Sequence, residues 1–276
     1  VAIDQSGDVW IGTLGGGLNR LDPRTGLVTH FNNDPNDPDS LSSNEVWSVF
    51  IDSFANLWVG TSAGVDILAH GSSSFIHLLP RPGDHHSLSS APVITITEDR
   101  EKNLWFGTEL GLEKYDRARM VFTRYQNDPW IVFTISGNEI KTLYIDSSGI
   151  LWIGTLNDGL NRYDLTTGQL NRFQHYPSDP GSISKNSILC IHQDKQGILW
   201  VGTDGGGLNR LDPEGNSYIH YGEADGLPNS VIFGILEDDN GFLWLSTNYG
   251  LSRFDPSTGK SLRNYTVDDG LQGNEF

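Results

Sequence analysis

Residues 194–203 read Asp-Lys-Gln-Gly-Ile-Leu-Trp-Val-Gly-Thr, and variants of this phrase recur along the whole chain. Its tryptophans are separated by 48, 47, 47, 48 and 44 residues. A phrase that recurs in register marks an internal repeat, so the chain is built from similar units of about 46 residues. The repeated tryptophans are Trp10, Trp58, Trp105, Trp152, Trp200 and Trp244.

An aspartate stands six residues before each of these tryptophans, and in four copies a glycine follows it three positions later. Asp at the first position and Gly at the fourth predict a tight turn between antiparallel strands. Ala55 and Lys102 replace that glycine in the second and third copies, so we expect strain or another turn type there. The aspartates are Asp4, Asp52, Asp99, Asp146, Asp194 and Asp238.

Each repeat predicts four short strands. Nearly continuous apolar runs precede the aspartates and predict first strands with both faces buried; they span residues 46–51, 93–97, 140–145, 188–191 and 231–236. The tryptophan phrase is the second strand, the Gly-Leu-Asn-Arg-Leu-Asp phrase at 17–22 and its echoes are the third, and runs such as 27–31 are the fourth. No helical pattern of useful length occurs. The predicted fold is all-β, a β-propeller of four-stranded antiparallel blades.

The number of blades follows from counting around the chain. Residues 245–276 and residues 1–10 together amount to nearly one repeat. We therefore predict a single domain over residues 1–276 with six blades, in which the two ends of the chain complete one blade. An arc of a larger, seven-bladed propeller is the alternative. The chain begins at Val1 without a signal peptide, so we expect a fragment of a longer chain.

Composition excludes several classes of protein. The chain has 18 Lys and Arg against 35 Asp and Glu, a net charge of −17, which is wrong for a protein that binds a phosphate backbone. No apolar run approaches the roughly 20 residues that span a bilayer. The single cysteine, Cys190, excludes an internal disulfide and a cysteine-rich zinc site.

The repeat resembles a known family. Asp-x-x-Gly-x-Leu-Trp-Ile/Val-Gly-Thr followed by Gly-Leu-x-Arg-Leu/Tyr/Phe-Asp is similar to the two-component regulator propeller repeat, and the likeness covers essentially the whole chain in six copies. The linkers at 34–44, 177–186 and 225–229 also fit that family. Copy two departs most, at residues 64–68, so we expect its outer strands to pack differently.

This resemblance implies an extracytoplasmic sensor region of a bacterial hybrid two-component histidine kinase. It implies a location on the periplasmic or extracellular side of a bacterial membrane, and a parent chain that continues into a membrane span and a kinase or other output domain. The expected ligand is an oligosaccharide or a similar polar molecule, and a dimer of the intact receptor is possible.

Two sets of loops should form the recognition surface. In a propeller, the linkers into the first strands and the turns from second to third strand open on the same face. The first four linkers are long and those at 222–228 and 266–273 are short. We therefore expect a face that is walled on one side and open beside the last two blades.

Candidate ligand residues lie in these loops. An Asn near the start of the first strand recurs at Asn44, Asn138, Asn186, Asn229 and Asn274, and it either closes a turn or belongs to a ring of amides at the channel mouth. Glu45, Trp47, Glu139 and Lys141 break the regular pattern nearby, where a specialised site would. The further candidates are Glu109, Trp130, Asn157, Asp158, Asp204, Asn248 and Tyr249.

The repeated tryptophans are predicted to be core residues, whereas Trp47 and Trp130 stand outside the repeat and are better ligand candidates. The arginine of Gly-Leu-x-Arg is predicted to pair with a nearby aspartate; it occurs as Arg20, Arg162, Arg210 and Arg253.

The sequence contains no catalytic motif and no histidine spacing typical of a metal site. We expect no cofactor, although the acidic linker 34–39 is a weak Ca²⁺ candidate. A non-catalytic sensor is the leading hypothesis. The alternatives are a propeller enzyme, a lyase or glycoside hydrolase with Glu45 and Glu139 across a sugar, and a protein-interaction scaffold.

Overall fold

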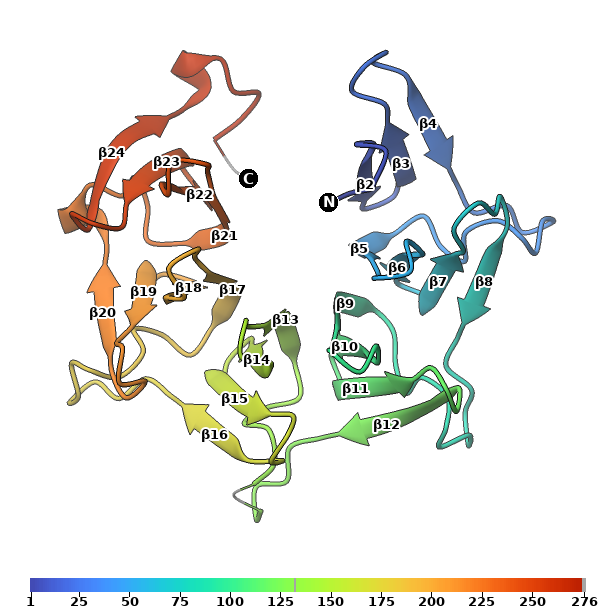
Figure 1. Cartoon of the computed structure of the whole chain (residues 1–276), viewed down its shortest axis with the longest axis horizontal. Coiled ribbons are helices and arrows are strands. Elements are labelled where there is room, and N and C mark those ends of the chain that lie inside the picture. The colour runs from blue at the N-terminus through green and yellow to red at the C-terminus, as the bar shows by residue number, and fades with distance from the viewer. Residues whose placement is uncertain (132, 275–276) are drawn as a thin grey trace. The chain divides into compact units, whose positions relative to one another are not determined.

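The computed structural model describes residues 1–131 and 133–274 of the chain. Within them a four-stranded antiparallel sheet occurs six times, and its strands neighbour one another in chain order (Figure 1). The predicted fold class, a six-bladed β-propeller of four-stranded blades, is confirmed.

The first three blades are β1 (Ala2–Ile3), β2 (Val9–Thr13), β3 (Gly17–Leu21) and β4 (Val28–Phe31); β5 (Val46–Ile51), β6 (Leu57–Thr61), β7 (Val65–Leu68) and β8 (Phe75–Leu78); and β9 (Val93–Glu98), β10 (Leu104–Thr108), β11 (Gly111–Asp116) and β12 (Val121–Tyr125). Blades 4 to 6 are β13 (Ile140–Ile145), β14 (Ile150–Thr155), β15 (Leu160–Asp164) and β16 (Leu170–Phe173); β17 (Ile188–Gln193), β18 (Leu199–Thr203), β19 (Leu208–Leu211) and β20 (Tyr218–Tyr221); and β21 (Ile232–Glu237), β22 (Leu243–Thr247), β23 (Gly250–Asp255) and β24 (Lys260–Tyr265).

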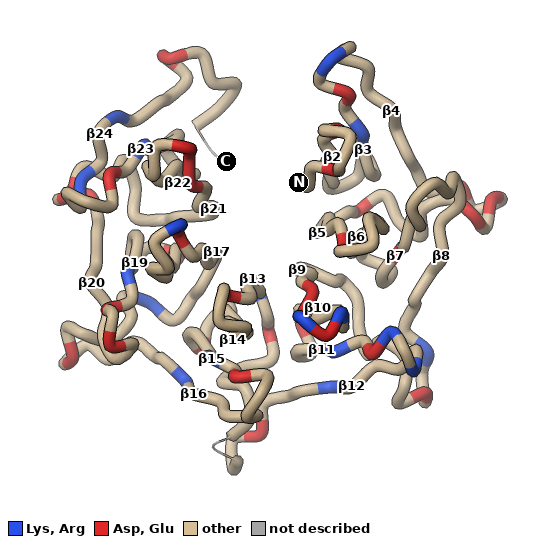
Figure 2. Tube along the Cα trace, in the orientation of Figure 1, with Lys and Arg blue, Asp and Glu red and all other residues tan. Residues whose placement is uncertain are grey.

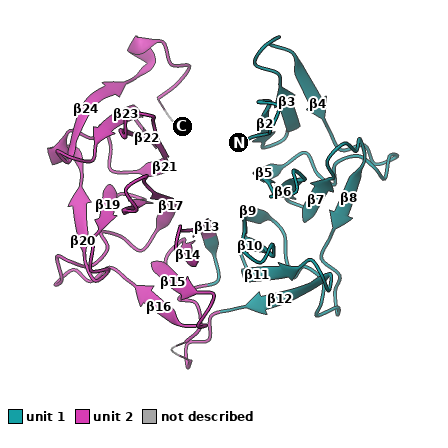
Figure 3. Ribbon diagram, in the orientation of Figure 1, with its two compact units in different colours: residues 1–126, 138–140 teal, residues 127–137, 141–276 magenta. Residues whose placement is uncertain are grey.

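The blades fall into two compact units (Figure 3). Unit 1 comprises residues 1–126 and 138–140, and unit 2 comprises residues 127–137 and 141–276. The predicted blade shared by the two chain ends involves both units and residues 275–276, which lie outside the described part, so it stays a prediction. The two short helices are η1 (Glu223–Asp225), which precedes Gly226, and η2 (Val267–Asp269), which precedes Gly270. Among the described residues, no helix has the length and hydropathy that a membrane span requires.

The aspartate of each repeat organises the turn between the first and second strands. Its carboxylate accepts a hydrogen bond from the indole of the tryptophan six residues later, at 2.7 to 3.1 Å, in all six copies. It also accepts the backbone N–H four residues later. Five of the tryptophans are at most 6% exposed and Trp244 is half-buried. The prediction that they are core residues is confirmed, and the bond explains why each polar indole edge can be buried.

The fourth turn position has a left-handed backbone. Four copies have glycine there, and Ala55 and Lys102 adopt the same conformation with φ of 63° and 70°. A side chain at positive φ crowds its own backbone, so the predicted strain of these two turns is confirmed.

The glycine of the tryptophan phrase allows neighbouring strands to approach closely. A Cβ on Gly202 would collide with Cys190 and lie 2.9 Å from Ile232 in the next blade. Copy six has Ser246 in this place, and the residue opposite it in β21 is Gly234. In copy six the glycine therefore lies on the first strand and the larger residue on the second, the reverse of the arrangement of Cys190 and Gly202.

The prediction that the first strands are buried on both faces is wrong. In β9, β13 and β17 only the first and fourth residues are buried, whereas every residue of β6, β10, β14 and β18 is buried. The first strand is the edge of its sheet and pairs on one side only. The second strand lies inside the sheet and packs against the next blade.

The predicted pairing of the repeated arginine holds in two copies. Arg20 pairs with Asp8, and Arg253 lies 3.7 Å from Asp238. For Arg162 and Arg210 no ion pair is found in the described part of the chain, so the prediction is wrong there. In both copies an isoleucine, at 150 and 198, stands where Asp8 pairs with Arg20 in the first copy.

Copy two obtains its cation from the next blade. Ile67 faces Trp58, where the other copies have Arg or Lys opposite the tryptophan. Arg117, which follows β11, lies 5.2 Å from the Trp58 ring centroid and forms ion pairs with Asp52 at 2.9 Å and Glu98 at 3.0 Å. Copy two thus differs in its packing, as expected, because the cation on its tryptophan comes from blade 3 and not from its own third strand.

Candidate functional site

The linkers and the turns between second and third strands lie together, as predicted. In unit 1, the backbone N–H groups of Gly15 and Gly17 donate to the carbonyl of Asn44, at 3.0 and 2.9 Å. In unit 2, Gly159 donates to the Asn186 carbonyl at 2.9 Å, and Gly207 donates to that of Ser230 at 2.7 Å. We call this end of the blades the linker end. The linkers that end at Asn44, Asn186 and Ser230 are thus bonded to the turn of the preceding blade.

A β-bulge interrupts several first strands at the linker end. In β5 the pairing with β6 skips Trp47, and the same shift occurs at Ile94, Leu189 and Phe233. A bulge places an extra, unpaired residue in the strand and redirects its side chain. Trp47 and Phe233 are 44% and 42% exposed. The sequence predicts Trp47 but not the other three positions, because a one-residue shift cannot be recognised in an apolar run.

The predicted site residues separate by exposure. In unit 1 the exposed members are Glu45, Trp47, Glu109 and Glu139, while Asn44 and Asn138 are half-buried. In unit 2 the exposed members are Trp130, Asn157, Asp204, Asn248 and Tyr249, while Lys141, Asp158, Asn186 and Asn229 are half-buried.

Backbone bonds join two of these residues to neighbouring loops. Glu45 forms an isolated bridge with Leu14, and its carbonyl accepts the backbone N–H of Ser62 at 3.0 Å. In unit 2, the backbone N–H of Asp204 donates to the Ser187 carbonyl at 3.0 Å.

The recurring asparagines close turns. The Oδ1 atoms of Asn44 and Asn186 accept the backbone N–H of Asn33 and His175, both at 2.7 Å. Asn274 accepts that of Val267 at 3.0 Å.

Asn229 lies one position earlier in the register than Asn44 and Asn186, because Ser230 supplies the equivalent carbonyl and Asn229 Oδ1 bonds Val231 N–H at 2.8 Å. The turn-closing interpretation is therefore supported where the bonds are seen, and a direct role in ligand binding stays a prediction.

The four long linkers are anchored by a polar residue that the sequence analysis did not single out. A linker serine donates its backbone N–H, at 2.8 to 2.9 Å, to the third-strand side chain 24 or 25 residues later. The pairs are Ser42 with Asp66, Ser89 with Glu113, Ser136 with Asn161, and Ser184 with Asn209. The recurring Leu/Ile-Ser of the linkers was the available signal.

Two of these anchors are acids. Asp66 is fully buried, and its Oδ1 lies 2.6 Å from His77 Nδ1. Glu113 is 1% exposed; its Oε1 accepts the Ser89 backbone N–H at 2.9 Å and lies 3.7 Å from Arg124, while its Oε2 is buried without a partner. Burial raises the pKa of Glu113 to about 7, against the opposing effects of Ser89 and Arg124.

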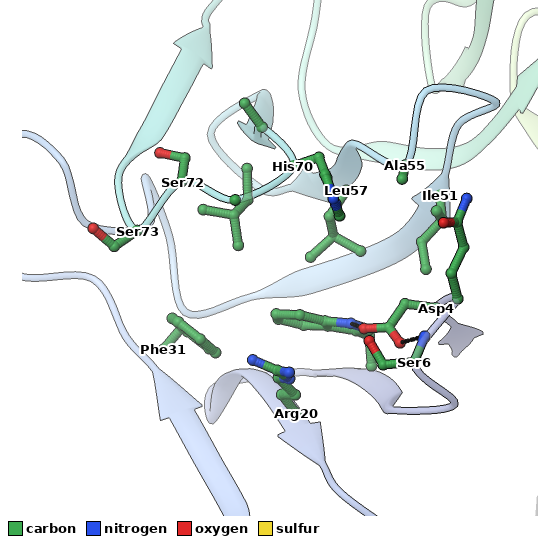
Figure 4. A pocket seen from close by; sticks show the side chains of 15 residues that line it. Asp4, Ser6, Arg20, Phe31, Ile51, Ala55, Leu57, His70, Ser72 and Ser73 are labelled. Atoms are coloured by element: carbon green, nitrogen blue, oxygen red, sulfur yellow. Dashed lines mark hydrogen bonds between the residues drawn. The ribbon is translucent and has the colours of Figure 1, made fainter.

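A hollow of about 400 Å³ lies at the opposite end of unit 1, between blades 1 and 2. Figure 4 shows Arg20 and Phe31 on one side of it and Leu57 and His70 on the other. The Asp4 carboxylate there accepts the Trp10 indole, and Arg20 pairs with Asp8. Because these polar groups already have partners and no predicted site residue lines the hollow, the linker end is the stronger candidate.

The acidic linker 34–39 forms two successive turns. Asp34 Oδ1 accepts the backbone N–H of Asn36, and Asp37 Oδ1 accepts that of Asp39. Within the described residues, no group of three His, Cys, Asp or Glu side chains is placed to hold a metal ion. Weak Ca²⁺ binding stays a prediction.

Six four-stranded blades joined by linkers of this kind define a repeat propeller whose binding surface consists of loops. Four stretches of the chain match the family model described as two component regulator propeller: residues 87–109, 134–157, 182–205 and 226–249. The predicted resemblance is confirmed, and the chain carries repeats of the two-component regulator propeller family.

Longer proteins contain similar segments. Histidine kinase P4 of Formosa agariphila is 34% identical over 61 residues, 22% of this chain and 4% of that protein. The extracellular domain of the hybrid two component system BT3049 from B. thetaiotaomicron is 23% identical with a TM-score of 0.70, over 97% of this chain and 40% of that one. That of BT4673 is 26% identical with a TM-score of 0.59, over 99% and 37%.

This chain thus spans less than half of each of these relatives. The two solved relatives are extracellular domains, in agreement with the predicted location of the chain on the periplasmic or extracellular side of a membrane.

A fold likeness also extends to an enzyme. A catalytically inactive virginiamycin B lyase from Staphylococcus aureus, solved with quinupristin, has a TM-score of 0.72 over 98% of this chain and 84% of that one. The identity is 15%, which shows a shared propeller fold and nothing about chemistry.

Proposed function

We propose that this chain is the ligand-sensing propeller of a bacterial signal-transduction receptor and that it binds an oligosaccharide or similar polar ligand at the linker end. The observation that carries the proposal is the bulge at Trp47, which exposes an aromatic ring two residues along the chain from the exposed Glu45. The relatives are extracellular domains of two-component systems, which supports a sensing role.

The chemistry of this patch suits a sugar. A sugar ring offers C–H groups that pack on an aromatic face and hydroxyl groups that donate to carboxylates. Ser43 and Ser62 lie beside Glu45, and their hydroxyl oxygens are 2.7 Å apart. A few fixed polar groups around an apolar surface are typical of small-ligand sites.

A thermal-unfolding screen against plant, microbial and host oligosaccharides tests the proposal, with Ca²⁺ and EDTA as controls. A ligand at 100 times its Kd adds about 2.7 kcal/mol of stability, which shifts the Tm by several degrees in a domain of this size. The shift should disappear in Trp47→Ala and shrink in Glu45→Gln. It should persist in the control Phe54→Ala, an exposed aromatic at the opposite end of the same blade. A shift unaffected by Trp47→Ala would contradict this site.

Sensing is favoured over catalysis by the exposure of Glu45 and Glu139. The general acid of a glycosidase works in a desolvated position, and neither side chain has one. If the chain were an enzyme, Glu45→Gln with Glu139→Gln would abolish turnover and leave substrate binding partly intact. If the chain is a sensor, neither the wild-type chain nor this double variant converts the sugar that stabilises it.

The signal would pass to another part of the parent protein. Similar segments occur in a histidine kinase and in hybrid two-component systems, so we propose a membrane span and a kinase or comparable output domain as partners. We also propose that the intact receptor forms a dimer. Crosslinking of the full-length chain in the membrane would detect it.

A further inference from the structure

The four long linkers share one backbone frame. In each, a hydroxyl accepts the backbone N–H of the residue six positions earlier and donates to that residue's carbonyl, at 2.9 to 3.3 Å. The hydroxyls belong to Ser40, Ser87, Thr134 and Ser182. The residues enclosed by each frame form its tip, of which residues 129–131 and 133 are described in the third linker, and the tips differ in chemistry.

The tip of the third linker is apolar, unlike the others. Trp130 is 92% exposed, Phe133 81% and Ile131 49%. The aligned positions in the first linker are Asn36, Asp37 and Asp39, and the other two tips are also built from Pro, Gly, Asp, His and Ser. Exposed large apolar side chains gathered on one tip are unusual on a water-soluble surface and mark an interaction site.

This tip is held outward by a built frame. Trp130 N–H donates to Asp128 Oδ1 at 2.9 Å, and Ile131 N–H donates to the Asp128 carbonyl at 3.1 Å. The Ile131 carbonyl accepts from Thr134 Oγ1 at 3.0 Å and from Arg172 on β16 at 3.2 Å. The backbone N–H groups of Trp130 and Ile131 and the carbonyl of Ile131 are therefore satisfied within the protein, which lowers the cost of an apolar surrounding.

We infer that the tip formed by Trp130, Ile131 and Phe133 inserts into a lipid surface. A tip of three side chains buries far less than the roughly 800 Å² per partner that a stable protein pair needs, which argues against a second copy as the occupant. A convex aromatic tip enters the interfacial layer of a bilayer without a complementary pocket, and tryptophan is enriched in that layer. The two solved relatives are extracellular domains, and such a domain of a membrane receptor lies near a lipid surface.

Charge defines the kind of lipid. The linker 126–139 carries Asp128 and Glu139 and no Lys or Arg, and the chain has a net charge of −17. Figure 2 shows red acidic segments on loops of both units. An anionic membrane repels such a protein, so the tip should prefer zwitterionic lipid. Salt should strengthen binding to vesicles that contain anionic lipid, because it screens the repulsion.

Vesicle sedimentation of the 276-residue chain tests this inference. We expect binding to vesicles of phosphatidylcholine and phosphatidylethanolamine, weaker binding when phosphatidylglycerol is added, and partial recovery in high salt. Brominated lipids should quench the fluorescence of Trp130. The variant W130N/F133D, which takes its residues from the first linker, should bind about tenfold more weakly or not at all. The control I76N/L262D removes two other exposed apolar side chains and should bind normally.

Thermal unfolding establishes that both variants are folded. No vesicle binding by the wild-type chain overturns the inference, as does equal binding by W130N/F133D. Concentration-dependent self-association in sedimentation velocity that W130N/F133D abolishes, without vesicle binding, would assign the tip to a second copy instead.

Discussion

Glu113→Gln should stabilise the protein at pH 8 and leave it nearly unchanged at pH 5. The carboxyl group is 1% exposed, one of its oxygens has no partner, and burial raises its pKa from 4.5 to about 7. A folded-state pKa above the unfolded value means that folding favours the protonated form. The stability associated with that proton is complete below about pH 4.5 and is lost as the pH rises through 7.

The size of the effect follows from the same pKa values. A tenfold change in a protonation equilibrium corresponds to about 1.4 kcal/mol, so a rise from 4.5 to about 7 lowers stability by about 3 kcal/mol once the group is ionised in both states. Glutamine has the same shape and no charge. Asparagines at the equivalent positions 161 and 209 accept the linker serine N–H and donate to its hydroxyl, so an amide fits this place in the fold.

Urea unfolding at pH 5 and pH 8 measures the difference. The wild-type free energy of unfolding should fall by up to about 3 kcal/mol relative to E113Q between these two pH values. Glu214→Gln is the matched control, because it makes the same substitution at an exposed position. Comparison with E113Q cancels the titration of His77 and His192, which both proteins share. Parallel pH curves, or a large loss in E113Q at pH 8, would show that Arg124 at 3.7 Å stabilises the ionised carboxylate and would refute the reasoning.

Three further predictions concern the turns and the packing of the blades. Ala55→Gly and Lys102→Gly remove side chains from positive φ and should each stabilise the fold by about 1 kcal/mol in thermal unfolding, whereas Gln196→Gly in the preceding position of another turn should not. Arg117→Met leaves Asp52 and Glu98 without their cation and should cost about 3 to 5 kcal/mol in urea unfolding; no loss would mean that the pair contributes nothing. Gly234→Ser should destabilise blade 6, since Ser246 Oγ lies 3.0 Å from the position of its Cβ, and Ser246→Gly in the same chain should restore stability.

The local parts of the fold could be predicted from the sequence. Asp194, Gly197 and Trp200 sit within seven residues of one another, so their turn and its strands are encoded in one short phrase, and six copies made the pattern unmistakable. What failed depended on distant residues. Arg117 of blade 3 supplies the cation that Ile67 does not supply in blade 2, and no local sequence pattern around either residue predicts this contact.

The candidate site was predicted only in part for the same reason. The linker end was located correctly, because antiparallel topology puts linkers and turns on one side. The bulges were missed, because Ile188 to Ile191 reads as an uninterrupted apolar strand whether or not one residue is skipped. The anchors Asp66 and Glu113 were missed, because their partners lie 24 residues earlier in the chain.

The hydrogen bonds at the linker end also rank the candidate residues. The amide oxygens of Asn44 and Asn186 each accept a backbone N–H, and in each long linker a hydroxyl is bonded to the frame of that linker. A ligand that bonded these atoms would have to break the loops that present it. The bulged side chains of Trp47 and Phe233 and the exposed tip side chains of Trp130 and Phe133 make none of the bonds that hold these frames, so they can change without loss of the fold. Specificity in this propeller should therefore reside in bulges and tips, and exchanging a tip between two linkers should alter what is bound while leaving the Tm almost unchanged.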